Sequence, residues 1–275
     1  MSKTKKPSIR DYLYEPPGPR TRTWIRVGTA LALGLIAALV YAVIHQFAVT
    51  GQLKAKYWSF FSRWTTWRFI GQGLLTTVEV ALTAAAITFA AGFLLMRGRL
   101  SRHAILWRLS AGLISFTRGV PTLLFIYFFF LVVPRTGVKL SAFWKITLPV
   151  AISACGVVAE AFRGGVNAVP RGQREAALSL GMTERRAFYR ILFPQAFRYI
   201  IPTLIAELVI VLKDTTFAYI VSCADLMQNA RVLISNYDAL VSTYLVVAVI
   251  YILINYGLNR LSENLAGRES RRKTA

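Results

Sequence analysis

The stretch Glu175–Pro194, EAALSLGMTERRAFYRILFP, is polar and basic and lies between long apolar runs of the chain. Its pattern predicts two short helices separated by a turn. Gly181 can end the first helix, because glycine readily adopts the left-handed conformation found at helix C-termini. Thr183 can cap the second helix, with Glu184 in its first turn. Such an ordered loop between apolar runs predicts an element that contacts a partner.

Both predicted helices have a surface suited to docking. Ala176 and Ala177 keep one face of the first helix small, so that a partner can approach closely. In the second helix, Phe188 and Ile191 belong to an apolar stripe at helical spacing, and Pro194 should end that helix and begin the next. A solvated connecting loop is the alternative, but it would leave this order unexplained. The expected docking residues are Glu175, Ala176, Ala177, Gly181, Phe188, Ile191 and Pro194.

The composition indicates a membrane protein. Of the 275 residues, 55% are hydrophobic, and the mean hydropathy of +0.49 is too high for an ordinary soluble domain. The formal net charge is +21. This charge lies in clusters between apolar runs and not on a polar domain, which argues against nucleic-acid binding and for membrane topology.

Six apolar runs are long enough to cross a bilayer, which takes about 20 residues per helix. The fold class expected is therefore an all-α membrane protein with six transmembrane helices. Arg118 and Pro121 interrupt the third run. Polar tails are expected at 1–23 and 263–275, and a polar loop at 163–198. The runs cover about 24–49, 70–96, 111–133, 142–162, 199–221 and 241–261.

The distribution of basic residues predicts the orientation of these spans. With the N-terminus inside, the cytoplasmic segments carry twenty-four of the 33 Lys and Arg residues, and the outside segments carry seven. This is the bias that the positive-inside rule predicts. We therefore expect a multi-pass protein of the plasma membrane with both termini and the loop 163–198 in the cytoplasm.

Several charged residues fall within or beside the apolar runs. A charge at the centre of a bilayer costs about 3 kcal/mol, so each needs a partner or an aqueous cavity. They could line a polar translocation path or gate, or they could form hydrogen bonds that fix helix packing; both readings stay open. The candidates for the path or gate are Glu79, Arg118, Glu160, Glu207, Lys213 and Asp214.

The sequence gives no sign of an enzyme or of a bound cofactor. It contains no G-x-x-x-x-G-K-[ST] motif for ATP, no G-x-S-x-G and no H-E-x-x-H. The intramembrane acids have no recognisable catalytic spacing. The two cysteines and two histidines are isolated, which predicts neither a disulfide nor a metal site.

The motifs resemble a known family. Glu175-Ala176-Ala177, Gly181, Ile191 and Pro194 resemble the EAA loop of ABC-importer permeases. Five further segments are similar to the polar amino-acid branch of that family, and the resemblance covers about residues 70–262. Residues 13–20 are also similar to the glutamate permeases of that branch. The five segments are 73–77, 118–121, 158–165, 169–173 and 212–216.

The resemblance implies a type I importer fold. Spans two to six, at about 70–262, would form a five-helix core, and residues 24–49 would be an added N-terminal helix. It further implies a homo- or heterodimer of permease subunits, two cytoplasmic ATPases that hold ATP and Mg²⁺, and an extracellular binding protein that delivers the amino acid. The EAA loop would lie in a groove of the ATPase. Glu79 departs from the commonest pattern, in which this position is apolar.

The function expected is transport of a polar L-amino acid, with glutamate favoured over glutamine, aspartate or a basic amino acid. A non-transporting membrane assembly subunit, whose loop only recruits a cytoplasmic partner, is an alternative from another class. An intramembrane enzyme is a third possibility, which would require two acids to converge within a few ångströms.

Overall fold

A computed structural model describes residues 18–273, with side chains described for 18–264. The chain divides into two units, 1–55 and 56–275. In the first, α2 (Pro19–Val49) is a single 31-residue helix with no buried side chain. It starts earlier than the apolar run at 24–49, with a proline in its first turn, where the missing N–H costs nothing. Most of the expected tail 1–23 lies outside the described residues.

The second unit is helical, and no described residue of the chain belongs to a strand. Short turns of 3₁₀- or π-helix connect the α-helices. The turns are η1 (Ala55–Tyr57), η2 (Ser59–Ser62), η3 (Phe128–Val132), η4 (Val133–Thr136), η5 (Phe188–Leu192) and η6 (Thr215–Val221). The α-helices are α3 (Trp64–Arg99), α4 (Ala104–Gly119), α5 (Thr122–Tyr127), α6 (Ala142–Ala168), α7 (Arg171–Ser179), α8 (Glu184–Ala187), α9 (Phe193–Asp214), α10 (Leu226–Tyr237) and α11 (Leu240–Lys273).

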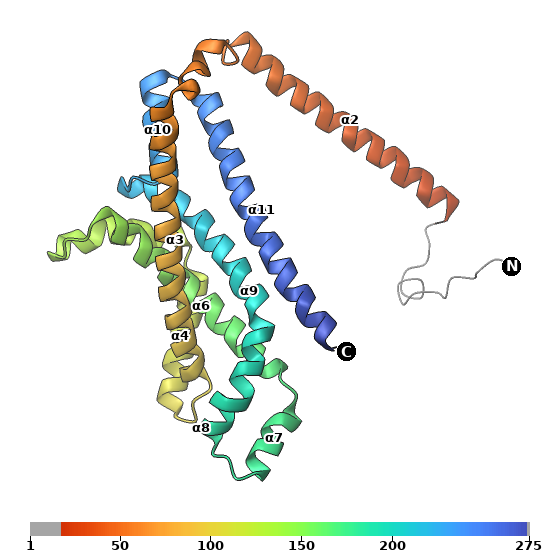
Figure 1. The fold of residues 1–275 in the computed structure, drawn as a ribbon, viewed down its shortest axis with the longest axis vertical. Coiled ribbons are helices and arrows are strands. Elements are labelled where there is room, and N and C mark those ends of the chain that lie inside the picture. The colour runs from red at the N-terminus through yellow and green to blue at the C-terminus, as the bar shows by residue number, and fades with distance from the viewer. Residues whose placement is uncertain (1–17, 274–275) are drawn as a thin grey trace. The chain divides into compact units, whose positions relative to one another are not determined.

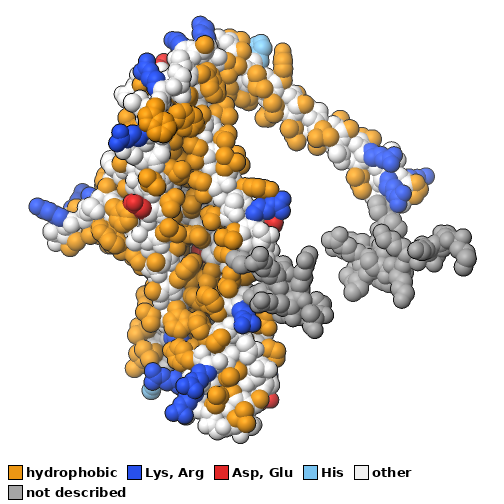
Figure 2. All heavy atoms as spheres, in the orientation of Figure 1, with side chains coloured by type: hydrophobic (Ala, Val, Ile, Leu, Met, Phe, Trp, Pro, Cys, Tyr) orange, Lys and Arg blue, Asp and Glu red, His pale blue; other side chains and the backbone are white. Residues whose placement is uncertain are grey.

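Helix α6 is the centre of this second unit. It packs against α3, α4, α5 and α9, while α11 packs against α9 and α10 packs against α3 (Figure 1). Glycines permit close approaches between these helices: a Cβ added at Gly92 would collide with Val158, and one at Gly156 would collide with Thr117. Small residues at such crossings allow membrane helices to pack by van der Waals contact. Hydrophobic side chains cover much of the visible face of the unit (Figure 2).

The helices correspond to the expected spans with two differences. α2, α3, α6 and residues 240–264 of α11 are long and apolar enough to cross a membrane. The third run forms α4 and the segment Thr122–Thr136, which are bent by 97° relative to each other. The bend falls at Pro121, which lacks an N–H to continue the α4 ladder. α9 is not among these helices, and it carries Arg198, Glu207, Lys213 and Asp214.

Candidate functional site: the 171–194 loop and the intramembrane polar groups

The first helix of the loop ends in a Schellman motif. α7 covers Arg171–Ser179. Gly181 adopts a φ of +75°. Its N–H donates to the Leu178 carbonyl at 2.9 Å, and the Met182 N–H donates to the Ala177 carbonyl at 3.1 Å. These two bonds satisfy carbonyls that a helix end otherwise leaves free, which confirms Gly181 as the C-terminal cap.

The second helix begins as predicted but ends differently. The Thr183 hydroxyl accepts a hydrogen bond from the Arg186 N–H at 3.4 Å, which confirms its role as the N-cap of α8. α8 then passes through the π-helical turn η5 directly into α9. The expectation that Pro194 ends a helix is therefore wrong. Pro194 lies in the first turn of α9, where its missing N–H is tolerated.

The apolar side chains of the loop point in two directions. Phe188 and Leu192 are buried in one cluster with Met96 and Phe162, so they anchor the loop to the helical core. Ala177 is also buried, whereas Ala176 is exposed, so the small face expected at these two alanines is only half available to a partner. Phe188 is likewise committed to the core. Of the other expected docking residues, Glu175, Gly181 and Pro194 are exposed and Ile191 is half-buried.

Sequence reasoning missed Leu180, which is the most exposed large hydrophobic residue of the described chain at 84%. It lies at the tip of the loop, beside Gly181. The capped turn leaves this apolar side chain in solvent, where a partner could contact it. Its only signal in the sequence is an apolar residue directly before the capping glycine.

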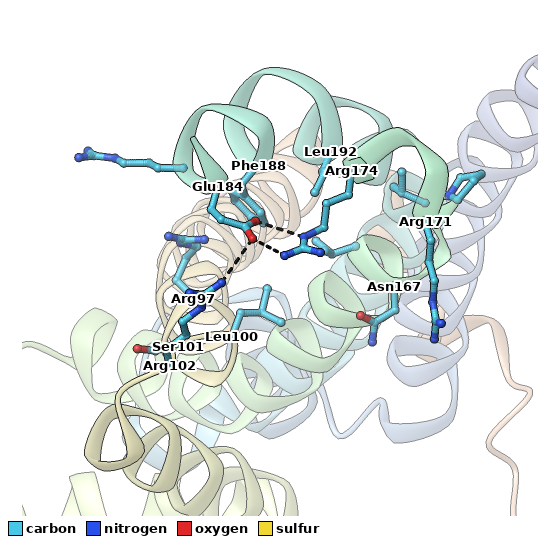
Figure 3. A pocket seen from close by; sticks show the side chains of 14 residues that line it. Arg97, Leu100, Ser101, Arg102, Asn167, Arg171, Arg174, Glu184, Phe188 and Leu192 are labelled. Carbon is cyan, nitrogen blue, oxygen red and sulfur yellow. Dashed lines mark hydrogen bonds and ion pairs between the residues drawn. The ribbon is translucent and has the colours of Figure 1, made fainter. Parts of the chain in front are cut away.

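Glu184 connects α7 to the segment between α3 and α4 through ion pairs. Its carboxylate accepts hydrogen bonds from the Nε of Arg174, at 3.2 Å, and from the Nη2 of the same guanidinium. It also pairs with Arg102 at 3.4 Å (Figure 3). Arg174 lies on α7 and Arg102 on the connection between α3 and α4, so the carboxylate links α7 to the α3–α4 connection. The sequence showed only its favourable place at a helix N-terminus.

Asp214, one of the predicted path residues, belongs to a hydrogen-bonded cluster that joins three helices. The Thr122 hydroxyl donates to Asp214 Oδ2 at 3.0 Å and lies 2.8 Å from the Ser153 hydroxyl. The bend at Pro121 places Thr122 at the start of α5, where it connects α9 to α6. Glu207 is buried on α9, two turns before Asp214. Asp214 and Glu207 are thus the acids that the structure places inside the helix bundle.

The remaining candidates do not join this cluster. Glu160 makes an ion pair with Arg163 of its own helix, at 2.6 and 2.9 Å. The side chains of Glu79, Arg118 and Lys213 are exposed and make no hydrogen bond or ion pair with any described residue. Within residues 18–264, no three His, Cys, Asp or Glu side chains are grouped so as to hold a metal ion.

A further acid lies in the connection before α10, outside the membrane-spanning helices. Asp225 is the N-cap of α10, and its Oδ1 accepts a hydrogen bond from the Gln228 N–H at 2.8 Å. Its Oδ2 is buried and has no hydrogen-bond partner among the described residues. Burial raises the pKa of this carboxyl to about 6, because the charged form loses its hydration. The α10 cap therefore contains a group that titrates near neutral pH.

Residues 84–271 match the family of binding-protein-dependent transport system inner membrane components. The chain belongs to this family. It is 28% identical over 205 residues to "Probable glutamine ABC transporter permease protein GlnP" of Bacillus subtilis, which covers 74% of this chain and 94% of the relative. It is 31% identical over 219 residues to "Glutamate transport system permease protein GluD" of Corynebacterium glutamicum, covering 78% and 80% of the two chains.

Solved structures agree with this assignment. The chain resembles a chain of "Crystal structure of an amino acid ABC transporter with histidines", with a TM-score of 0.71 and 27% identity over 76% of this chain and 98% of the other. A methionine ABC transporter in inward-facing conformations shares the fold, with a TM-score of 0.59 at 15% identity over 74% and 99% of the two chains. The protein is therefore the permease of an amino-acid ABC importer, which implies a second permease subunit and a separate ATPase subunit that hydrolyses ATP.

Proposed function

We propose that this permease carries glutamate across the plasma membrane, with both termini in the cytoplasm. Two relatives support this substrate: GluD of C. glutamicum and, at 29% identity, "Glutamate/aspartate import permease protein GltK" of Escherichia coli. Glutamine is the second candidate, because GlnP of B. subtilis is named for it. An extracellular binding protein would deliver the substrate to a homo- or heterodimer of permeases built on residues 70–262, with α2 as an added helix.

The loop at 163–198 is proposed as the site where the ATPase acts. One observation carries this role: the loop exposes Leu180 at its tip while it buries Phe188 and Leu192 in the helical core. A partner that pulls or pushes the tip would move α9 and α6 through this anchor. ATP and Mg²⁺ would be held by the ATPase, whose closure on ATP would rock the core between inward- and outward-facing states.

The polar cluster of Asp214, Thr122 and Ser153 is proposed as part of the gate. It joins α9, α5 and α6 through hydrogen bonds of 2.8 and 3.0 Å, so a rotation of α9 relative to α5 would strain or break the bond to Asp214. Glu207 is proposed to line the path beside this gate. Glu160 pairs with Arg163 of its own helix. Glu160, Glu79, Arg118 and Lys213 stay candidates for contacts with substrate or with the second permease.

Uptake of radiolabelled substrate tests both parts of this proposal. In a strain that lacks the gene, restoring it should restore glutamate uptake, and unlabelled glutamate should compete better than glutamine. Preferred competition by glutamine would move the substrate assignment to glutamine. In vesicles that contain the complete complex and ATP, a lack of any accumulation would instead favour the non-transporting assembly role.

A further inference from the structure

A basic cavity of about 900 Å³ lies between the α3–α4 connection and the α7–α8 loop (Figure 3). Its walls come from the ends of α3 and α6, from α7 and from α8. Five arginines line it, and Glu184 is the one acidic residue among its lining side chains. The arginines are Arg97, Arg102, Arg171, Arg174 and Arg185.

The charge of this cavity is only partly compensated within the described chain. Glu184 pairs with Arg102 and Arg174, and one carboxylate against five guanidinium groups leaves a formal charge of +4. Arg171 and Arg185 make no ion pair with any described residue. Like charges gathered around one cavity repel each other, and an anion in the cavity would relieve that repulsion.

The arginine side chains of the cavity favour a phosphate among the possible anions. All five basic residues are arginines, whose planar guanidinium groups match phosphate oxygens in a two-pronged geometry. The cation of Arg97 is held 4.4 Å from the ring centre of Phe188, so packing positions it at the cavity wall. Arg171 is the first residue of α7, where the unpaired N–H groups of the first turn also favour an anion.

The apolar lining and the position of the cavity point to a lipid as a source of phosphate. Leu100, Val166, Val169 and Leu192 contribute to the walls. Arg97 directly follows the apolar run 70–96, and Val166 lies near the end of α6. Both helices are apolar enough to span a membrane, so a lipid headgroup at this end of the helices could reach the cavity. An anionic phospholipid could place its phosphate among the arginines and its first methylene groups against the apolar wall.

We propose that this cavity binds a phosphate-bearing anion, and that an anionic phospholipid headgroup is its occupant in the membrane. The phosphate would bridge Arg97 and Arg102 on one side to Arg171 and Arg174 on the other, and so would join the α3–α4 connection to α7. The assignment of this lipid to the cytoplasmic leaflet rests on the proposed cytoplasmic location of the loop. The proposed phosphate binding by the arginines does not depend on that location.

Lipid binding by the purified full-length permease tests the site. Native mass spectrometry in detergent would compare retention of phosphatidylglycerol with retention of phosphatidylcholine, with and without inorganic phosphate. The double variant Arg97→Gln/Arg171→Gln removes one cation from each side and leaves both pairs of Glu184 in place. The matched control Arg190→Gln/Arg198→Gln removes the same charge at exposed positions that do not line the cavity. Because Arg97 also packs on Phe188, Arg171→Gln alone serves as the milder variant.

Wild type should retain phosphatidylglycerol about tenfold better than phosphatidylcholine, and the double variant should lose most of that preference, since a charge-assisted hydrogen bond contributes on the order of a tenfold change in affinity. Competition by millimolar inorganic phosphate would assign the site to soluble phosphate-bearing anions as well. The proposal is overturned if the double variant and the wild type bind alike, if the control loses the preference equally, or if the double variant only weakens assembly with the ATPase. These measurements need no transport, so they succeed or fail independently of the proposed substrate.

Discussion

Replacing Glu184 by glutamine should loosen the 171–183 segment without unfolding the protein. The substitution keeps the shape of the side chain but removes both ion pairs that join α7 to the α3–α4 connection. The Arg102 side chain is 87% exposed and the Arg174 side chain is 48% exposed. Exposed ion pairs contribute about 0.2–1 kcal/mol each, with two-pronged arginine pairs at the upper end. We expect a total loss of about 1 kcal/mol, mostly from Arg174.

A loss of about 1 kcal/mol corresponds to a roughly fivefold increase in local opening. Hydrogen exchange of backbone amides in residues 171–183 should therefore be about fivefold faster in Glu184→Gln, while amides of α6 and α3 keep their wild-type rates. Raising the salt concentration should move wild type toward the variant, because salt screens exposed charges. In the assembled transporter, substrate moved per ATP hydrolysed should fall, because a looser α7 transmits less of the ATPase movement.

The variant Glu175→Gln is the matched control for this experiment. Glu175 lies on α7 beside Arg174, is exposed and makes no ion pair with any described residue. Its exchange rates should equal those of wild type. The swapped pair Arg174→Glu/Glu184→Arg should recover part of the protection. Wild-type exchange rates in Glu184→Gln at low salt would refute the view that these ion pairs hold the loop.

Three further outcomes follow from single groups. Gly181→Ala places a Cβ in the left-handed region and should destabilise the loop by about 1 kcal/mol, seen as less uptake per ATP at unchanged insertion; wild-type coupling would contradict this. Thr122→Val leaves Asp214 without its hydrogen bond, which should destabilise the protein by about 1–3 kcal/mol and lower its melting temperature; an unchanged melting temperature would contradict this. Because burial raises the pKa of Asp225 from its ordinary value of about 4 to about 6, the folded state loses stability as pH rises between these two values. Asp225→Asn should therefore stabilise the protein by up to roughly 3 kcal/mol at pH 8 and raise its melting temperature there, but not at pH 4. The control Asp238→Asn, at an exposed position, should change the melting temperature at neither pH. An equal effect of Asp225→Asn at both pH values would exclude this titration.

Features set by local chemistry could be predicted from the sequence. The glycine cap at Gly181 and the hydroxyl cap at Thr183 act within four residues, so their partners are fixed by the backbone nearby. The break at Pro121 is local in the same sense. Pro194 shows the limit of this reasoning, because a proline does not by itself end a helix. It is tolerated where no hydrogen bond from its N–H is needed, as in the first turn of α9 after the π-helical turn η5.

Contacts between distant segments could not be predicted in this way. Arg102 and Glu184 are 82 residues apart, and only the packing of α3 against α6 brings their segments together. The stripe of Phe188 and Ile191 was visible at helical spacing, but spacing alone does not say which direction the stripe faces. Burial of Phe188 beside Met96 decides that it is an anchor. The basic cavity likewise depends on segments far apart in the sequence that no local pattern connects.

The exposed tip and the buried base of the loop must be considered together. A loop that only exposed Leu180 could bind an ATPase, but a flexible base would absorb the movement. A loop that only buried Phe188 and Leu192 would be rigid but would expose no apolar group for the ATPase to contact. Here the capped turn at Gly181 fixes the tip, Glu184 ties α7 to the α3–α4 connection, and η5 continues into α9 without a break. Displacement at the tip therefore has a continuous path of packed and bonded groups to the helix that carries Glu207 and Asp214.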